Sequence, residues 1–235
     1  MKPLSLFLKS TLPGVGLAAL VLLVGLKPVE AERSPCAGLV NPDHKRACFE
    51  REFESADRRL QRVTEAIYED LGESQRQELQ ADALRWAGYR DELCGDPDGL
   101  ETDGQTALFA CRLELTNERM DYVRRAFSGE GVRSGRAGVY DDGFGGQLTL
   151  RSLEGETLQF AIDVVRGPTA HIGQISGEIQ IQNGEARFES EANCGDRCCT
   201  LEFRFFERAV EVTEGECSEY HGLRAYFDGR YRKIR

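Results

Sequence analysis

Eight cysteines are the residues of this chain with the clearest potential for chemistry, and they fall into two groups of four. The groups are Cys36, Cys48, Cys94 and Cys111, and then Cys194, Cys198, Cys199 and Cys217. Each group is even, so each half of the chain can close its own disulfides. Residues 129–138 separate the groups and hold four glycines without apolar periodicity, which is typical of a flexible linker.

The second group also has features of a zinc site. Cys194, Cys198 and Cys199, with Cys217 and His221, would supply thiolates and an imidazole of the kind zinc prefers. An even number of cysteines behind an export signal favours disulfides instead. We predict bonds from Cys199 to Cys217 and from Cys194 to Cys198, because the strands that lead to Cys199 and Cys217 are expected to pair.

The first group leaves more than one pairing open. Folding the second predicted helix back along the first brings Cys94 near Cys48 or Cys36, and Cys111 then takes the remaining partner. Four cysteines allow three pairings, and the sequence does not choose among them. The wide spacing of Cys36 from Cys48, and of Cys94 from Cys111, disfavours a metal site here.

A run of acidic side chains lies between Cys94 and Cys111. It consists of Asp96, Asp98, Glu101 and Asp103. Leu100 stands where an EF-hand needs an oxygen ligand, so calcium is not expected. The segment is either an ordinary solvated loop or an acidic protrusion that docks a basic partner, with a cysteine near each end to hold it.

No pattern of residues predicts catalysis. His44 is isolated, and no serine or cysteine has a base implied by its spacing. His171 has no visible ligand partner either. We therefore predict a protein that is not an enzyme, with no cofactor and no metal.

Residues 1–31 have the features of an export signal. Lys2 and Lys9 give a positive start, residues 17–26 are almost continuously apolar, and residues 29–31 offer small side chains to a signal peptidase. The apolar run is shorter than the roughly 20 residues of a membrane-spanning helix. Cleavage after Ala31 is expected, without stable membrane insertion, and the mature chain is predicted to be periplasmic or secreted.

The mature chain is strongly acidic. The full sequence has 30 basic and 40 acidic side chains, and removing residues 1–31 leaves 27 and 39, a net charge of −12. This charge disfavours nucleic acid and anionic membranes as partners. Residues 32–130 carry −8 of it, so a cationic partner is expected to bind the first half.

The two halves differ in apolar period. In residues 32–128, apolar side chains recur at helical spacing in three segments, with Asn41 and Pro42 starting the first helix and the third starting near Thr106. Residues 139–235 alternate over seven or eight short stretches, the last at 224–231, and Asn183-Gly184 indicates a hairpin. The predicted fold class is α+β in two domains, a disulfide-crosslinked three-helix bundle followed by an antiparallel small barrel or sandwich.

The helical half carries a specific set of spaced residues. They are Ala56-Asp57-x-x-Leu60, Trp86-x-x-Tyr89-Arg90-Asp91-x-x-Cys94 and Cys111-x4-Thr116-x-x-Arg119, together with Cys36 and Cys48. On these residues the chain resembles the lysozyme inhibitor LprI-like N-terminal domain family over about residues 36–127. The second half, with Phe227-Asp228-Gly229-x-Tyr231, is similar to the barrel-like domain often found after such helical modules.

Most motif residues are interpreted as structural. Trp86 lies on the inner stripe of its helix and is expected in the core. Asp57, Arg90, Asp91 and Arg119 are expected to form ion pairs that join the helices. The resemblance implies an envelope protein that inhibits lysozyme, with a basic c-type lysozyme as the partner. The charge of the acidic segment makes Asp96, Asp98, Glu101 and Asp103 the expected docking residues. The alternative is a non-inhibitory structural or ligand-binding envelope module.

Overall fold

The computed structural model describes residues 34–95, 100–128, 132, 134–167, 171–190 and 198–235, of which Pro35–Arg235 form one compact unit. The predicted signal peptide, residues 1–31, lies outside the described residues, as do Asp96, Asp98 and Cys194 and most of the linker up to residue 133.

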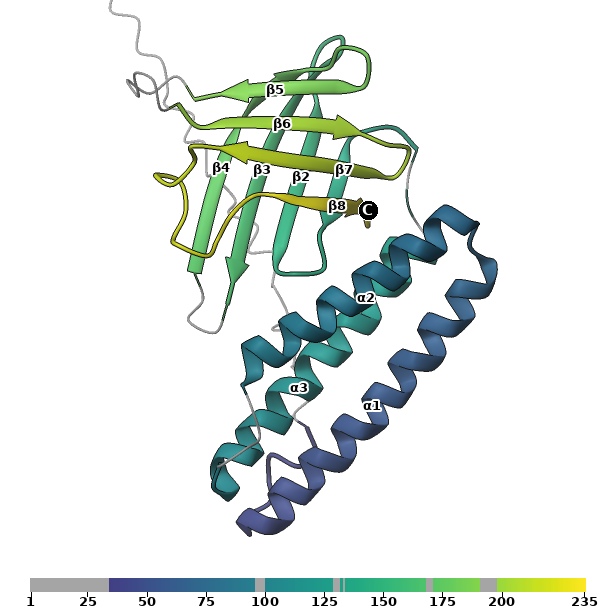
Figure 1. Cartoon of the computed structure of the whole chain (residues 1–235), viewed down its shortest axis with the longest axis vertical. Helices are drawn as coiled ribbons and strands as arrows, with labels where there is room; N and C mark the ends of the chain where they lie inside the picture. The colour runs from purple at the N-terminus through teal and green to yellow at the C-terminus, as the bar shows by residue number, and fades with distance from the viewer. Residues whose placement is uncertain (1–33, 96–99, 129–131, 133, 168–170, 191–197) are drawn as a thin grey trace, which may run out of the picture. The chain divides into compact units, whose positions relative to one another are not determined.

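Three long helices make up the first part of this unit (Figure 1). They are α1 (Pro42–Asp70), α2 (Glu73–Cys94) and α3 (Thr102–Val123), and a π-helical turn, η1 (Arg124–Ser128), follows α3. As the sequence predicted, Asn41 begins α1, with its side chain accepting a hydrogen bond of 3.0 Å from the His44 amide. The third helix begins at Thr102 rather than near Thr106, so Asp103 lies in its first turn.

The helices share one apolar core. Its buried residues include Leu60, Leu71, Leu79, Trp86, Met120, Val123 and Phe127. α1 packs mainly along α3, and the rings of Phe53 and Phe109 lie 6.3 Å apart between them. The core is small, so crosslinks add to its stability.

The disulfides of the helical part do not follow the predicted approach of Cys94 to the start of the first helix. Cys36 is bonded to Cys48, and Cys94 is bonded to Cys111. The argument that Cys94 reaches back to the start of the first helix is wrong, because α1 packs along α3 and makes little contact with α2. Each bond therefore joins positions close in sequence, 12 and 17 residues apart.

Eight antiparallel strands form the second part as a single, nearly closed barrel (Figure 1). Their order is β4-β3-β2-β1-β8-β7-β6-β5, and β1 pairs with β8. The strands are β1 (Gly138–Asp141), β2 (Gly146–Ser152), β3 (Thr157–Arg166), β4 (His171–Gln180), β5 (Glu185–Glu189), β6 (Thr200–Phe205), β7 (Ala209–Gly215) and β8 (Gly229–Lys233). Asn183 and Gly184 turn the chain between β4 and β5 with positive φ values of 54° and 83°, which suits the predicted hairpin.

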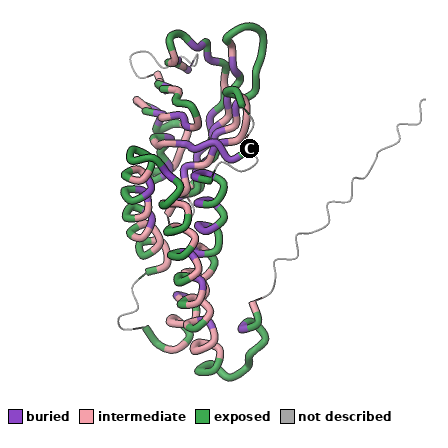
Figure 2. Tube along the Cα trace, turned by 90° about the vertical axis from the view of Figure 1, so that its right-hand side faces the viewer, coloured by how far each residue is buried: buried purple, intermediate pink, exposed green. Residues whose placement is uncertain are grey.

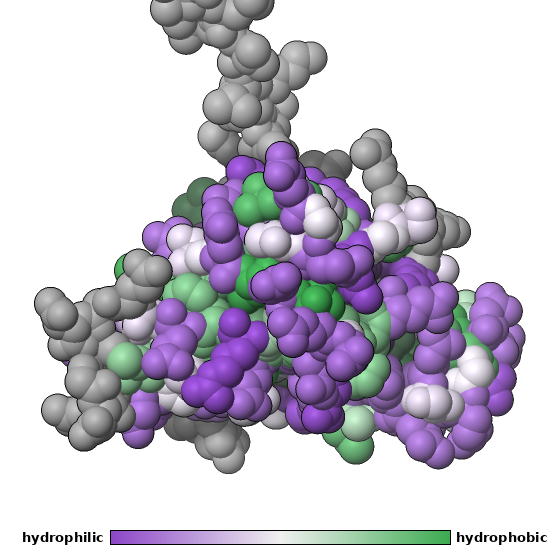
Figure 3. All heavy atoms as spheres, turned by 90° about the horizontal axis from the view of Figure 1, so that it is seen from above, coloured by the Kyte–Doolittle hydropathy of each residue, from purple (hydrophilic) through white to green (hydrophobic). Residues whose placement is uncertain are grey.

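The barrel is filled by its own side chains. Phe160, Ile162 and Phe203 are at most 1% exposed, and the rings of Phe160 and Phe203 lie 5.1 Å apart. Figure 2 shows the buried positions alternating with exposed ones along the strands. Hydrophilic side chains cover most of the face seen in Figure 3. The interior of the barrel is therefore a packed core rather than a cavity.

The cysteines of the barrel follow the predicted hairpin. Cys199 is bonded to Cys217, which confirms that pairing, because the β6–β7 register places Thr200 opposite Gly215. Cys198 is disulfide-bonded too, and its predicted partner Cys194 lies outside the described residues. None of the cysteines that the structure describes is a free thiol.

The two parts of the unit share a core. Ile234, directly after β8, is 4% exposed and belongs to the apolar cluster of the helices. Glu78 of α2 forms ion pairs with Arg230, at 2.9 Å, and with Arg232. The guanidinium of Arg232 also lies 4.2 Å from the centre of the Phe127 ring. The end of the barrel strand β8 thus takes part in the packing of the helices.

We predict that Ile234→Ala lowers the free energy of unfolding by about 2–4 kcal/mol, because it leaves a cavity in the helical core. Urea unfolding followed by circular dichroism measures this loss. Leu223→Ala is the control, since Leu223 is 95% exposed and its truncation should change stability by less than about 0.5 kcal/mol. Equal stability of the two variants would show that Ile234 does not join the barrel to the helices.

Candidate functional site

Trp86 organises the motif residues of the helical part. Its side chain is buried, at 6% exposure, as the sequence predicted. The guanidinium groups of Arg90 and Arg119 lie 5.2 Å and 5.4 Å from its ring centre. Arg90 lies one turn after Trp86 on α2, whereas Arg119 belongs to α3, so the contact between Arg119 and the indole stabilises the packing of α2 against α3. Trp86 is therefore part of the core and not an exposed binding residue.

Ion pairs join the three helices at the end that carries the cysteines. Arg90 Nη1 lies 3.3 Å from Asp57 of α1, and Arg90 Nε lies 3.1 Å from Asp91. Arg112 of α3 also pairs with Asp91, at 3.4 Å. The expected network of Asp57, Arg90 and Asp91 is present, and both carboxylates are about half exposed, so each pair contributes little to stability.

Arg119 forms a separate, buried pair with Asp82, a residue that the sequence analysis missed. The side chains of Arg119 and Asp82 are 2% and 5% exposed. Thr116, one turn before Arg119 on α3, is fully buried as well. Asp82 was detectable, because positions 79, 82 and 86 share one face of a helix and its two neighbours there are apolar.

Removing Asp82 should be far more costly than removing Asp57. We expect Asp82→Ala to lower the free energy of unfolding by about 3–5 kcal/mol, since it leaves the Arg119 guanidinium buried without a counter-charge. Asp57→Ala, at an exposed ion pair, should cost about 1 kcal/mol or less. Chemical denaturation of both variants gives the comparison, and similar midpoints would refute the importance of the buried pair.

The predicted docking segment lies between α2 and α3. Of its four acidic residues, the structure describes Glu101 and Asp103, and both are exposed. The Cys94–Cys111 bond closes the segment directly, so its two ends are fixed by a single crosslink. Asp103 in the first turn of α3 also suits the positive end of a helix dipole, which is the structural explanation for an acid here.

A pocket of about 460 Å³ lies where α2 meets the rim of the barrel, and the sequence analysis did not predict it. Its α2 residues are Arg85, Tyr89, Glu92 and Leu93. The barrel contributes Asp142, Phe144, Arg166, Arg224, Tyr226 and Arg230, among others. Because the α2 residues and the barrel residues lie between 49 and 145 positions apart in the chain, sequence spacing carried no signal for their convergence.

A buried ion pair forms one side of this pocket. Arg166 Nη2 lies 2.5 Å from Asp142 Oδ2, and both side chains are at most 8% exposed. The other oxygen of Asp142 accepts hydrogen bonds of 2.8 Å from the amides of Phe144 and Gly146. Both oxygens of Asp142 are thus occupied, and Arg166 is held in one orientation.

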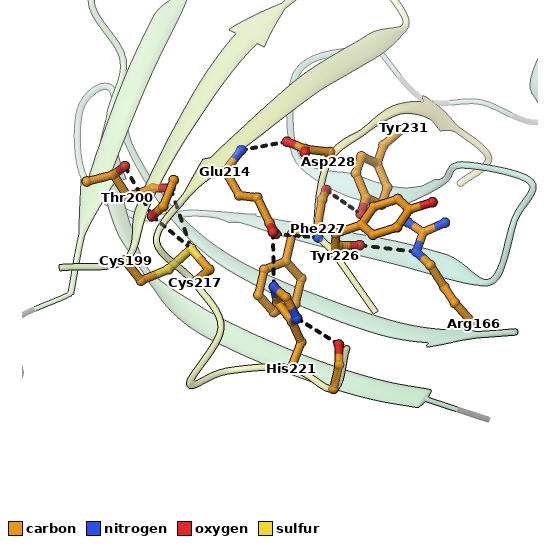
Figure 4. A network of polar contacts seen from close by, with 12 residues as sticks. Arg166, Cys199, Thr200, Glu214, Cys217, His221, Tyr226, Phe227, Asp228 and Tyr231 are labelled. Carbon is orange, nitrogen blue, oxygen red and sulfur yellow. Dashed lines mark hydrogen bonds and ion pairs between the residues drawn. A yellow bond between two sulfur atoms is a disulfide. The ribbon is translucent and has the colours of Figure 1, made fainter. Parts of the chain in front are cut away.

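The segment between β7 and β8 forms another wall and is fixed by side chains (Figure 4). Arg166 Nε donates to the carbonyl oxygen of Tyr226 at 3.1 Å, and Glu214 Oε2 accepts from the amide of Phe227 at 2.6 Å. The other Glu214 oxygen lies 3.0 Å from His221 Nε2. These bonds use backbone groups that a strand would need. The strand predicted over 224–231 therefore starts later, at Gly229, and runs to Lys233 as β8.

Asp141, at the end of β1, carries a shifted pKa. Burial raises the pKa of its carboxyl from 3.8 to about 6, although a hydrogen bond from the Gly143 amide opposes the shift. The folded chain therefore binds more protons at Asp141 than the unfolded chain between about pH 4 and 6. Its contribution to stability is largest below pH 4 and falls as the pH rises through 6.

Replacing this carboxyl by an amide should reveal that effect. We predict that Asp141→Asn raises the free energy of unfolding by about 1–2 kcal/mol at pH 7 and changes it little at about pH 3, where the parent carboxyl is mostly protonated in both the folded and the unfolded chain. The amide oxygen can still accept from Gly143. Urea midpoints at the two pH values measure the difference, and an equal effect at both would contradict the shifted pKa.

Metal ligation and membrane spanning were considered for the described part of the chain. Within it, no group of three or more His, Cys, Asp or Glu side chains is placed to hold a metal ion. No helix in the same residues has the length and apolar character to cross a membrane.

The fold is that of a disulfide-crosslinked three-helix domain followed by a nearly closed eight-stranded barrel, and its disulfides indicate a compartment outside the cytosol. A family model described as lysozyme inhibitor LprI matches residues 36–122. The match covers α1, α2 and nearly all of α3, so the resemblance drawn from the motif residues is confirmed for this domain. Comparison with curated proteins gave no match, and comparison with solved structures gave none.

Proposed function

We propose that this protein is a periplasmic or secreted lysozyme inhibitor that binds a basic c-type lysozyme through the acidic surface of its helical domain. The observation that carries the proposal is the match of residues 36–122 to the lysozyme inhibitor LprI family. That description is of an inhibitor rather than an enzyme, which agrees with the lack of a nucleophile and base paired by sequence spacing.

Charge supports this choice of partner. Residues 32–130 carry a net charge of −8, and a basic lysozyme carries the opposite sign. Opposite net charges speed the encounter of two proteins and orient them before contact. The acidic segment after α2 is the best candidate for the contact itself, because Glu101 and Asp103 are exposed and the Cys94–Cys111 bond limits the freedom of the segment. A constrained loop loses less conformational entropy on binding than a free one.

The second candidate function is a ligand-binding envelope module without inhibitory activity. The pocket at α2 and the barrel rim favours it, since its volume lies in the range of small-molecule sites. The two functions are compatible, because the acidic segment and the pocket involve different residues.

The test uses the oxidised chain from residue 32 onward and purified c-type lysozyme. We expect the chain to slow clearing of a peptidoglycan suspension at low ionic strength. Binding should weaken at high salt, as the Debye length falls from about 10 Å at 0.1 M to about 3 Å at 1 M. Unchanged lysozyme activity at low salt would refute the proposed function.

A pair of charge variants locates the contact. Neutralising Asp96, Asp98, Glu101 and Asp103 together should lower the association rate about tenfold. The matched control neutralises four exposed acids of the barrel, Glu154, Glu178, Glu207 and Glu219. Surface plasmon resonance compares the two, and equal loss of association rate in both variants would remove the acidic segment as the docking element while leaving inhibition itself intact.

A further inference from the structure

We infer that the pocket between α2 and the barrel rim binds a small anionic ligand that has a carboxylate or phosphate group on a ring-sized apolar body. Four arginines reach this pocket, Arg85, Arg166, Arg224 and Arg230, against three acidic side chains. Each of these arginines already contacts one carboxylate, and the partners are Asp82, Asp142, Glu92 and Glu78. The pocket therefore offers an anion the guanidinium donors that these contacts leave unused. Such a concentration of guanidinium groups favours anions.

The arginines at the mouth have donors left for a ligand. Arg85 is 65% exposed, and its nearest carboxylate contact, to Asp82, is long at 3.6 Å. Arg224 is 58% exposed and contacts Glu92 at 3.4 Å. A guanidinium has five N–H donors, so either side chain can offer a two-pronged contact to a carboxylate or phosphate. An anion here would compete only with long ion-pair contacts, of 3.6 Å at Arg85 and 3.4 Å at Arg224.

Aromatic side chains of the pocket indicate what the apolar part of the ligand should be. The rings of Tyr89 and Phe144 meet edge to face at 5.6 Å, and Arg85 lies 5.9 Å from the Phe144 ring centre. Tyr226 lies over the Arg166 guanidinium at 5.1 Å. Burial raises the pKa of Tyr89, so its phenol stays protonated and can donate to an anion. The volume of about 460 Å³ suits a ring with one or two substituents.

Hydrogen bonds and an ion pair hold two walls of the pocket. Asp142 and Arg166 lock one side, and the bonds from Glu214 and Arg166 to Phe227 and Tyr226 lock another (Figure 4). A preformed site avoids the entropic cost of ordering its walls when the ligand enters. The inference does not depend on lysozyme binding, because none of these residues lies in the acidic segment.

The test is an NMR titration of the oxidised chain from residue 32 onward with four probes that share one ring. Phenyl phosphate and benzoate are the anionic probes, benzyl alcohol is the neutral one and benzylamine the cationic one. We expect amide shifts at Phe144, Gly167 and Gly229 with the anionic probes, with at least fivefold weaker binding of the other two. The ratio between phenyl phosphate and benzoate distinguishes a phosphate site from a carboxylate site.

A double variant tests the role of the arginines. Arg85→Gln with Arg224→Gln should weaken binding of the better anionic probe at least fivefold, and both positions are exposed enough to leave folding unchanged. The control is Arg58→Gln with Arg187→Gln, whose side chains are 62% and 60% exposed elsewhere. Equal binding of all four probes, equal loss in both variants, or an absence of shifts at the pocket amides would each overturn the inference.

Discussion

The buried pair of Arg119 and Asp82 is the interaction on which the arrangement of this protein depends. It joins α3 to α2 beneath Trp86, and each partner is almost completely removed from water. It also constrains the barrel, because a Cβ on Gly143 would come within 2.8 Å of Arg119 Nη1. Gly143 has a φ of +77°, so this turn after β1 requires glycine for both conformation and space. One ion pair therefore fixes two helices and limits how the barrel can approach them.

The contact between the helices and the barrel is also related to the irregular connection between β7 and β8. The segment before β8 gives its backbone bonds to Glu214 and Arg166 instead of to a neighbouring strand. Released from the sheet, it can form a wall of the pocket, while Ile234 after β8 packs into the helical core. The loss of regular strand structure at 224–228 and the formation of the pocket are two results of one set of hydrogen bonds.

The acidic segment and the arginine-lined pocket lie at different places on the chain. The acidic segment after α2 is closed by the Cys94–Cys111 bond, and the arginines gather near Tyr89 and Phe144. Tyr89 and Arg90 follow one another in the same motif, yet Arg90 joins the helices and Tyr89 faces the barrel rim. A single turn of α2 thus contributes to the stability of the helical domain and to the pocket.

The sequence by itself determined the fold class, the start of α1, the Asn183–Gly184 turn, the core position of Trp86 and the Cys199–Cys217 bond. Each depends on local period, turn chemistry or the register of one hairpin, which neighbouring residues set. Only the tertiary structure decided the disulfides of the helical domain, the partner of Arg119 and the existence of the pocket. Those features depend on which helices pack together and on contacts between distant segments, and α1 lies along α3 rather than α2 for reasons of side-chain packing that apolar periodicity does not encode.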